Sequence, residues 1–171
     1  RRFKTGTPAR VDARSIDFDQ MEKQPGDDPV TPFSFLTDRA LENKECCYLT
    51  WTNERTHDII RRNIHLAPMY SGLLHSVGAR YCPSIEDKVT RFADKTRHQL
   101  FLEPEGLNYP EWYVQGLSTG LPKDVQVSLY RSVRGMSRAV LVRLAYAIEY
   151  DCIDPTALSP ALQYHNVSGL F

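Results

Sequence analysis

Within residues 46–68 the hydrophobic pattern changes, over two residues, from that of a strand to that of a helix. This change limits the folds that the chain can adopt. Residues 46–52, CCYLTWT, are rich in aromatic and β-branched side chains, which is typical of a strand. Thr52 or Asn53 can cap the helix that follows, whose isoleucines recur at helical spacing until Pro68 ends it. A strand that passes directly into a capped helix predicts a domain in which a sheet and helices pack together.

The rest of the chain alternates between the same two patterns. Residues 98–106 and 139–153 are β-like, FSF at 33–35 suggests a short strand, and another is expected near residues 114–118. A helix is expected over KDVQVSLYRSVRG, with Asp124 as a plausible cap and Gly135 at its C-terminal end. Some gaps between strands resemble hairpins, and QPGDDPVTP at 24–32 predicts a loop.

The composition excludes several classes of protein. At 171 residues one domain is the default, and no apolar run approaches the roughly 18 residues of a membrane helix. The 21 basic residues equal the 21 acidic ones, so a globally basic nucleic-acid binder is not indicated. The four cysteines include no CxxC pair, and the five histidines show no zinc-ligand spacing with them. This usage indicates a reducing compartment and no metal site.

Cys82 stands just before a predicted helix start, and two interpretations of it remain open. Ser84 is a good N-cap, and Asp87 three positions later completes the pattern of a capping box. A thiol near a helix N-terminus, with Arg80 two residues upstream, is expected to have a lowered pKa and to react as the thiolate. A lone cysteine is, however, more often an inert buried side chain.

Seven segments, taken in order along the chain, resemble one family. They are FKTGTPARVDARSIDF, TNERTHDIIRRNI, PMYSG, RYCPSIEDKVTRFAD, HQLFLEPEGLN, LSTGLPKDVQ and AYAIEYDCIDP. The segment that contains Cys82 is the most specific of them. On these segments the chain resembles the glucose-inhibited division protein A (GidA/MnmG) family over essentially its whole length. Members of that family are the large flavoprotein subunits of the bacterial enzyme that modifies the wobble uridine of tRNA.

The resemblance implies an activity, cofactors and partners. Such an enzyme uses FAD and NADH and acts with a GTPase partner. It places an aminomethyl or carboxymethylaminomethyl group on carbon 5 of the uridine, with a one-carbon unit from a folate. The resemblance also implies a cytoplasmic homodimer that binds tRNA and no membrane. It implies a catalytic role, as nucleophile or acid/base, for Cys82. It further implies NAD(H) binding by a continuous segment made of Gly78, Ala79, Arg80, Tyr81, Cys82, Pro83, Ser84, Ile85, Glu86, Asp87, Lys88, Val89, Thr90, Arg91 and Phe92.

The resemblance also implies which part of such an enzyme the chain represents. The family's glycine-rich dinucleotide turn and its helical C-terminal region are not found in the sequence, so a central fragment is expected. We expect an α+β fold with a mixed, partly antiparallel sheet and about three main helices, as the insertion domain of an enzyme similar to FAD-dependent oxidoreductases. Residues 1–20 would flank the flavin-binding domain, residues 21–145 would form the insertion domain with a candidate NAD(H) site, and residues 146–171 would return towards the flavin-binding domain. Alone, the fragment is expected to be inactive and not to retain FAD.

Two alternatives belong to other classes of function. Basic residues gather in residues 1–14, whereas residues 17–45 hold eight acidic and three basic side chains. The chain could therefore be a non-catalytic tRNA-docking module, with phosphates on Lys4, Arg10, Arg14, Arg61 and Arg62. It could also be a structural core alone. For the polar side of the first helix, including His57, a solvated surface is the simpler expectation.

Overall fold

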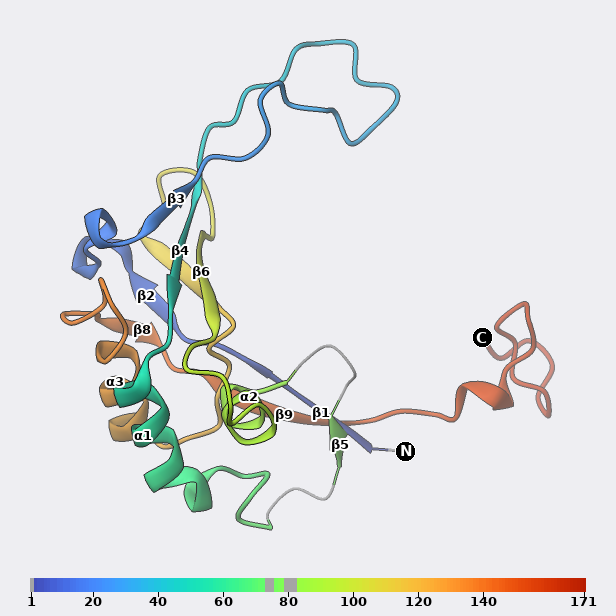
Figure 1. Ribbon diagram of the computed structural model, residues 1–171. Helices are drawn as coiled ribbons and strands as arrows, with labels where there is room; N and C mark the ends of the chain where they lie inside the picture. The colour runs from blue at the N-terminus through green and yellow to red at the C-terminus, as the bar shows by residue number, and fades with distance from the viewer. Residues whose placement is uncertain (1, 73–75, 79–82) are drawn as a thin grey trace.

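The computed structural model describes residues 2–72, 76–78 and 83–171 (Figure 1). Within these ranges the α-helices are α1 (Glu54–Asn63), α2 (Ile85–Arg91) and α3 (Lys123–Arg131). The strands are β1 (Arg2–Thr7), β2 (Arg10–Asp12), β3 (Glu22–Gln24), β4 (Cys47–Trp51), β5 (Val77–Gly78), β6 (Gln99–Pro104), β7 (Glu111–Gln115), β8 (Leu141–Arg143) and β9 (Tyr146–Asp151). Three main helices beside two sheets confirm the expected α+β class.

The larger sheet carries the core of the protein. Its strand order is β3-β4-β6-β7-β2-β8, and neighbouring strands are antiparallel. Side chains alternate between the two faces of a strand, so Leu100 and Leu102 of β6 are buried, whereas Glu103 lies on the opposite face. The buried face packs against the helices, and the other face presents polar side chains near β6 and β7.

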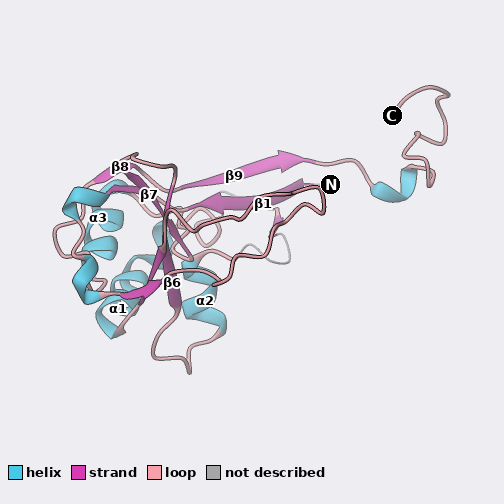
Figure 2. Cartoon of the chain, turned by 90° about the horizontal axis from the view of Figure 1, so that it is seen from above, coloured by secondary structure: helices cyan, strands magenta, loops and turns pink. Residues whose placement is uncertain are grey.

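The smaller sheet pairs the start of the described chain with a strand from its last third. Its order is β5-β1-β9: β1 runs parallel to β5 and antiparallel to β9. Arg2 lies opposite Asp151, and Thr7 lies opposite Tyr146. Beyond β9, residues 152–171 extend away from the body of the protein, as Figure 2 shows. The sheet is therefore mixed, as expected, and it brings residues 2–7 beside residues 146–151.

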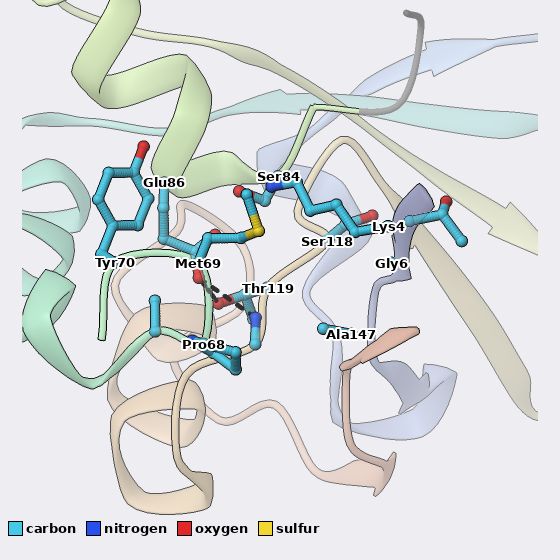
Figure 3. Close-up of a pocket in the computed structure, with 13 residues that line it drawn as sticks. Lys4, Gly6, Pro68, Met69, Tyr70, Ser84, Glu86, Ser118, Thr119 and Ala147 are labelled. Atoms are coloured by element: carbon cyan, nitrogen blue, oxygen red, sulfur yellow. Dashed lines mark hydrogen bonds between the residues drawn. The ribbon is translucent and has the colours of Figure 1, made fainter. Parts of the chain in front are cut away.

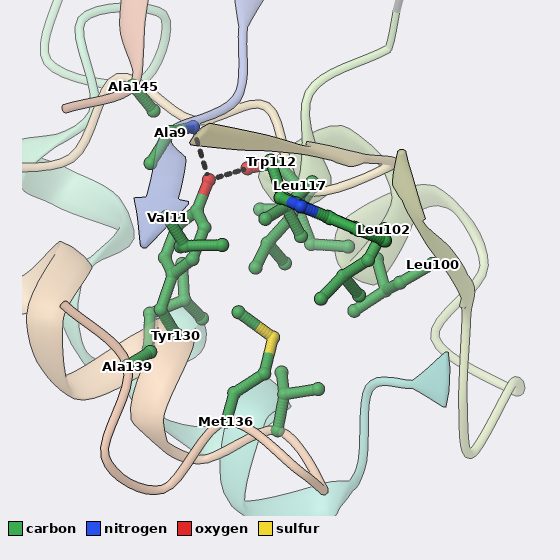
Figure 4. Close-up of a cluster of buried hydrophobic side chains, with 14 of the residues drawn as sticks. Ala9, Val11, Leu100, Leu102, Trp112, Leu117, Tyr130, Met136, Ala139 and Ala145 are labelled. Carbon is green, nitrogen blue, oxygen red and sulfur yellow. Dashed lines mark hydrogen bonds between the residues drawn. The ribbon is translucent and has the colours of Figure 1, made fainter. Parts of the chain in front are cut away.

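Tyr130 of α3 anchors the centre of the hydrophobic core (Figure 4). Its ring is fully buried, and its hydroxyl accepts a hydrogen bond from Ala9 N at 2.6 Å and donates one to Leu117 O at 3.0 Å. Burial raises the pKa of this hydroxyl far above its ordinary value, so it stays protonated. The two hydrogen bonds tie the link between β1 and β2 to the loop after β7 across the core.

The start of α1 agrees with the sequence prediction, but the expected solvated His57 is wrong. Asn53 caps α1, because its side chain accepts from Thr56 N at 3.0 Å. His57 is only 2 % exposed, and its Nε2 lies 2.8 Å from Thr52 Oγ1. The imidazole thus lies on the buried face, where a hydroxyl satisfies its ring nitrogen. The helix also ends at Asn63, before a 3₁₀ turn over Ile64–Leu66, rather than at Pro68.

The predicted strand at 33–35 is absent from the structure. Residues 25–46 instead form a long loop between β3 and β4 that projects from the rest of the protein (Figure 1), and Phe33 and Phe35 within it are fully exposed. An aromatic-rich segment that finds no partner strand has no backbone hydrogen bonds to form a ladder. Pattern alone could not show that partner strands were lacking here.

The β-like run at 139–153 divides between the two sheets. β8 pairs with β2 in the larger sheet, and β9 pairs with β1 in the smaller one. At the break, Ala145 N donates to Gln126 Oε1 at 2.9 Å, and Gln126 Nε2 donates to Ala145 O at 2.9 Å. The buried Gln126 side chain therefore replaces a strand partner for one residue, and the chain leaves one sheet for the other.

Candidate functional site

The first turn of α2 has the capped geometry that the sequence predicts. Ser84 Oγ accepts from Asp87 N at 3.2 Å, and Asp87 Oδ2 accepts from Ser84 N at 3.2 Å. Two helix-terminal N–H groups are thereby satisfied reciprocally. Ile85 N donates to Ser118 O at 2.8 Å, which fixes the start of α2 against the loop after β7.

Cys82, the predicted catalytic residue, lies outside the described residues. The same holds for Ala79, Arg80 and Tyr81. Of the predicted NAD(H)-binding segment, the structure describes Gly78 at the end of β5 and residues 83–92. Pro83, which is bonded to Cys82, is exposed. The role of the thiol is therefore still a proposal.

A buried ion pair joins α2 to β1. Lys4 Nζ lies 3.1 Å from Asp87 Oδ2, and the two side chains are 6 % and 8 % exposed. Tyr70 Oη donates to the second oxygen, Asp87 Oδ1, at 3.1 Å. Burial acts to raise the pKa of Asp87, but the hydrogen bond and charge of Lys4, with the Ser84 N–H and Tyr70, together hold it below its ordinary value. The carboxylate that completes the capping box thus also serves as the counter-ion of Lys4.

Glu86 is a second buried carboxylate on the same turn. Its Oε1 accepts from Thr119 Oγ1 at 2.6 Å and from Gly120 N at 3.2 Å. Its Oε2 is buried and has no hydrogen-bond partner among the described residues. Figure 3 shows Glu86 on the wall of a cavity of about 30 Å³, which is large enough for a water molecule, beside Met69 and Thr119.

The described part of the predicted NAD(H) segment does not fit a dinucleotide pyrophosphate. Anion sites at helix N-termini need free backbone N–H groups. Here the N–H groups of Ser84, Ile85 and Asp87 already have partners inside the protein. Glu86, which forms no ion pair among the described residues, also places a carboxyl group on this turn that would repel phosphate. We therefore assign neither NAD(H) nor FAD to the described residues.

The side chains predicted to contact tRNA phosphates belong to separate elements. Lys4 is buried with Asp87, as described above. Arg10 contacts Glu105 at 2.8 Å, and Arg14 contacts Asp12 at 2.6 Å. Arg61 and Arg62 are exposed near the end of α1, and Arg61 lies 3.2 Å from Asp58. The structure does not gather these five residues into one basic patch. Arg61 and Arg62 are the only two of the five that lie on one described helix, and both are exposed.

A polar groove lies where α2 approaches β6 and β7. It measures about 450 Å³, within the range of small-molecule sites, and its lining includes Pro83, Lys88, Glu103, Tyr113, Gln115 and Gly116. We call it the Lys88–Glu103 groove. Sequence periodicity did not predict that Glu103, Lys88, Gln115 and Tyr113 lie together. The signal that could have found them is the alternation of β7, which puts Tyr113 and Gln115 on one face.

The two charged side chains of this groove are poorly neutralised. Lys88 Nζ donates to Gly116 O at 3.3 Å, and no described carboxylate forms an ion pair with it. Burial therefore lowers the pKa of Lys88. The Gln115 amide nitrogen donates to the Glu103 carboxylate. Burial, and then the nearby Glu105, raise the pKa of Glu103. Both shifts oppose the charged forms, as expected of groups in a partly dehydrated site.

The described residues contain neither a cluster of metal ligands nor a membrane-spanning helix. No group of three or more His, Cys, Asp or Glu side chains there could hold a metal ion. Cys46 and Cys47 carry unbridged thiols, and burial raises the pKa of Cys47. No described helix is long and apolar enough to cross a membrane.

Comparison with known proteins places the chain in a family. The model of the family described as "Glucose inhibited division protein A" matches residues 1–171. The chain is 56 % identical over 171 residues to the tRNA uridine 5-carboxymethylaminomethyl modification enzyme MnmG of Clostridium botulinum (strain Loch Maree / Type A3), covering 100 % of the chain and 27 % of that protein. It is 58 % identical over 172 residues to the enzyme of the same name from Lachnoclostridium phytofermentans, covering 99 % of the chain and 27 % of that protein.

Solved structures show the same relationship. The form I crystal structure of Aquifex aeolicus GidA matches with a TM-score of 0.90 and 52 % identity, over 100 % of this chain and 30 % of that one. The form II crystal structure matches with a TM-score of 0.88 and 49 % identity, over 100 % of this chain and 27 % of that one. The chain thus spans about a quarter of the length of the curated relatives. The chain matches this family in sequence over its whole length and in fold, and it belongs to the glucose-inhibited division protein A family.

Proposed function

We propose that this chain is part of an enzyme that modifies carbon 5 of the wobble uridine of tRNA. The observation that carries the proposal is the match of the whole chain, at 56 % identity, to a protein named as a tRNA uridine 5-carboxymethylaminomethyl modification enzyme. The product would carry an aminomethyl or carboxymethylaminomethyl group on carbon 5. In the whole protein the reaction would involve a GTPase partner and a one-carbon unit from a folate.

Cys82 is the proposed nucleophile of this reaction. Carbon 5 of uracil gains nucleophilic character when a thiolate adds to carbon 6. The Sγ–C6 bond forms, and the electron pair of the C5=C6 bond moves through carbon 4 to O4 as an enolate. Carbon 5 then attacks the one-carbon electrophile. Loss of the proton from carbon 5 and departure of the thiolate restore the double bond.

The cofactors and partners belong to the proposal for the whole protein. FAD and NADH would supply its redox chemistry, and the enzyme would act as a cytoplasmic homodimer. We propose that residues 21–145 form its insertion domain, while residues 1–20 and 146–171 belong to the flavin-binding domain. Pairing of β1 with β9 supports a shared domain for residues 2–7 and 146–151, although β2 pairs within the larger sheet and β5 adds to the smaller one. Because the described residues offer no site for a pyrophosphate, the isolated chain should be inactive and colourless after purification. A yellow preparation with stoichiometric flavin would contradict this part of the proposal.

Variants of Cys82 in the full-length protein test the proposed role. Cys82→Ala and Cys82→Ser should both abolish modification of the wobble uridine, because a hydroxyl is a far weaker nucleophile at neutral pH. Nucleoside analysis of tRNA from cells that carry each variant measures the product, and melting temperatures of the purified proteins report on folding. Near-normal modification by either variant would reject the catalytic role.

A tRNA-docking role is the second candidate. The exposed guanidinium groups of Arg61 and Arg62 at the end of α1 favour it. Phosphate contacts make binding strongly salt-dependent, and removal of one such contact reduces the slope of log K against log salt by about 0.7–0.9. Binding of tRNA to this chain across a salt series tests the role, with Arg61→Ala/Arg62→Ala as the variant. A flat salt dependence would exclude it.

A further inference from the structure

The Lys88–Glu103 groove contains an ammonium group that the described protein leaves without an anion. A partly buried lysine normally pairs with a carboxylate, because desolvation of an unpaired charge is costly. Lys88 Nζ instead meets the carbonyl of Gly116 at 3.3 Å. A carbonyl oxygen takes one of the three donors of the ammonium group. The remaining donors suit a ligand oxygen, above all one that gains negative charge during a reaction.

Glu103 gives the groove a second, complementary function. Its carboxylate accepts from the Gln115 amide nitrogen, which fixes its orientation and leaves further lone pairs for a ligand. Tyr113 of β7 lies directly opposite Glu103 of β6 in the sheet. The guanidinium of Arg10 lies 4.6 Å from the centroid of the Tyr113 ring. The groove thus offers a fixed acceptor beside a cationic donor. That pair matches a planar imide, which carries an N–H group between two carbonyl oxygens.

We propose that the Lys88–Glu103 groove binds the uracil base, with Lys88 donating to the oxygen that becomes the enolate and Glu103 accepting from N3–H. This inference rests on the proposed function, and it adds a catalytic residue, Lys88, to the reaction. When the thiolate forms its bond to carbon 6, the C5=C6 electron pair moves to O4, and the Lys88 ammonium stabilises the charge there. Departure of the thiolate returns the pair and releases the base.

Three features favour uracil over a phosphate or a dinucleotide. Glu103 would repel a phosphate group, whereas it satisfies an imide N–H. Pro83 lines the groove and is bonded to Cys82, the proposed nucleophile, so the thiol and the groove are neighbours along the chain. The shifts in the pKa values of Lys88 and Glu103 indicate a partly dehydrated environment, in which a cation beside a developing enolate is most effective.

Exchange of the hydrogen on carbon 5 tests this proposal without any redox step. Once the thiolate has added, the enolate takes a proton from water at carbon 5, and loss of the original deuteron with departure of the thiolate gives exchanged uridine. The full-length protein would be mixed with an anticodon stem-loop RNA carrying 5-deuterouridine at the wobble position, and loss of deuterium followed by mass spectrometry. Lys88→Met should slow the exchange by about 100- to 1,000-fold, the usual effect of removing one group that stabilises an oxyanion. Lys88→Arg, which keeps the charge, should retain more exchange than Lys88→Met.

Matched controls separate this role from a structural one. Lys95→Met removes a lysine that is exposed and lies outside the groove, and it should leave the exchange rate unchanged. The melting temperature of Lys88→Met should not fall, since methionine removes a charge that the described protein does not neutralise. Glu103→Gln gives an independent variant: it should weaken discrimination between wobble uridine and N3-methyluridine, which lacks the N3–H group.

The outcomes separate failure of this inference from failure of the proposed function. If the wild-type protein with its partner modifies tRNA, yet Lys88→Met exchanges deuterium at the wild-type rate, Lys88 has no role at O4. Wild-type modification without any exchange at carbon 5 would likewise overturn the inference. A Lys88→Met defect confined to NADH oxidation would place a dinucleotide, rather than uracil, in the groove. If wild-type protein with its partner modifies no wobble uridine, the proposed function itself is wrong.

Discussion

Replacing Asp87 with asparagine should destabilise the protein by about 3–5 kcal/mol, because it leaves the Lys4 ammonium buried without its counter-ion. Both side chains are less than a tenth exposed, and their charged atoms lie 3.1 Å apart. Solvent therefore screens the pair weakly, so the value for buried pairs applies rather than the 0–1 kcal/mol, roughly, of surface pairs. Lys4→Met should lower the free energy of unfolding by less than Asp87→Asn, because Asp87 still accepts hydrogen bonds from Ser84 N and Tyr70 Oη.

The double variant Lys4→Met/Asp87→Asn distinguishes an ion pair from two separate losses. Removing both charges avoids an unpaired buried ion, so the double variant should be more stable than Asp87→Asn alone. The coupling free energy should be about 2 kcal/mol or more. Urea unfolding at pH 7 measures each value, provided that the slope with denaturant is unchanged. Arg61→Ala, which breaks a half-exposed pair with Asp58, is the control and should cost about 0–1 kcal/mol.

Two results would refute this reasoning. One is a loss below about 1 kcal/mol for Asp87→Asn, which would mean that water reaches Lys4. The other is a double variant whose loss of stability equals the sum of the losses of the two single variants.

The pH dependence of stability gives a separate check. The pKa of Asp87 is lowered in the folded state. Its contribution to the free energy of unfolding is therefore present above the ordinary pKa of 3.8 and is lost as the pH falls through the pKa of the folded state. Wild type should therefore lose more stability below about pH 4 than Asp87→Asn does.

Three further predictions concern the core and the surface. Tyr130→Phe should cost about 1–3 kcal/mol in urea unfolding, because it leaves Ala9 N–H buried without an acceptor; a neutral substitution would contradict this. The pKa of His57 is lowered, mainly by burial and then by the charges of His98 and Arg61. The stability that the neutral imidazole contributes is therefore present above the ordinary pKa of 6.5 and is lost as the pH falls below it. His57→Gln should therefore lose less stability than wild type between pH 7 and pH 5, and equal losses would show that His57 does not titrate there. Phe33→Ser/Phe35→Ser should change the melting temperature by less than about 2 °C, because both rings are fully exposed, and a larger fall would show that they pack.

Local signals in the sequence predicted the elements whose hydrogen bonds are also local. The capping box predicted at Ser84 and the cap predicted at Thr52 or Asn53, which is Asn53, appear in the structure because an N-cap side chain bonds to N–H groups only a few residues away. The cap predicted at Asp124 is wrong, because α3 begins directly after Pro122 and Asp124 lies in its first turn. The strand predicted at 98–106 is present, and β6 covers Gln99–Pro104 within it. These elements depend on their own residues more than on distant partners.

The elements that sequence reasoning missed depend on partners far away in the chain. Residues 139–153 look like one strand, but the Gln126 side chain bonds to Ala145 and divides them between two sheets. FSF at 33–35 has the composition of a strand but no strand to pair with. His57 falls on the buried side because Thr52 and His98 lie beside it. None of these contacts can be read from periodicity.

The same limit applies to the candidate site. The family signature around Cys82 pointed to the start of α2, and its capping was predicted. The Lys88–Glu103 groove, in contrast, is made by α2 together with β6 and β7. A sequence pattern does not show that Lys88 reaches the Gly116 carbonyl, or that Gln115 turns towards Glu103.

The place of β2 in the larger sheet has a consequence for folding during synthesis. Arg10 and Val11 are synthesised before their partners, which are Tyr113 and Trp112 on one side and Arg143 and Leu141 on the other. Such distant pairings form slowly, because the chain must close a long loop before they add stability. While the later half is being made, β3, β4 and β6 can pair, but β2 has no partner strand until β7 has emerged. We therefore expect nascent chains that stop before β7 to remain sensitive to protease at residues 10–12, and full protection there to appear only after β8 has also emerged.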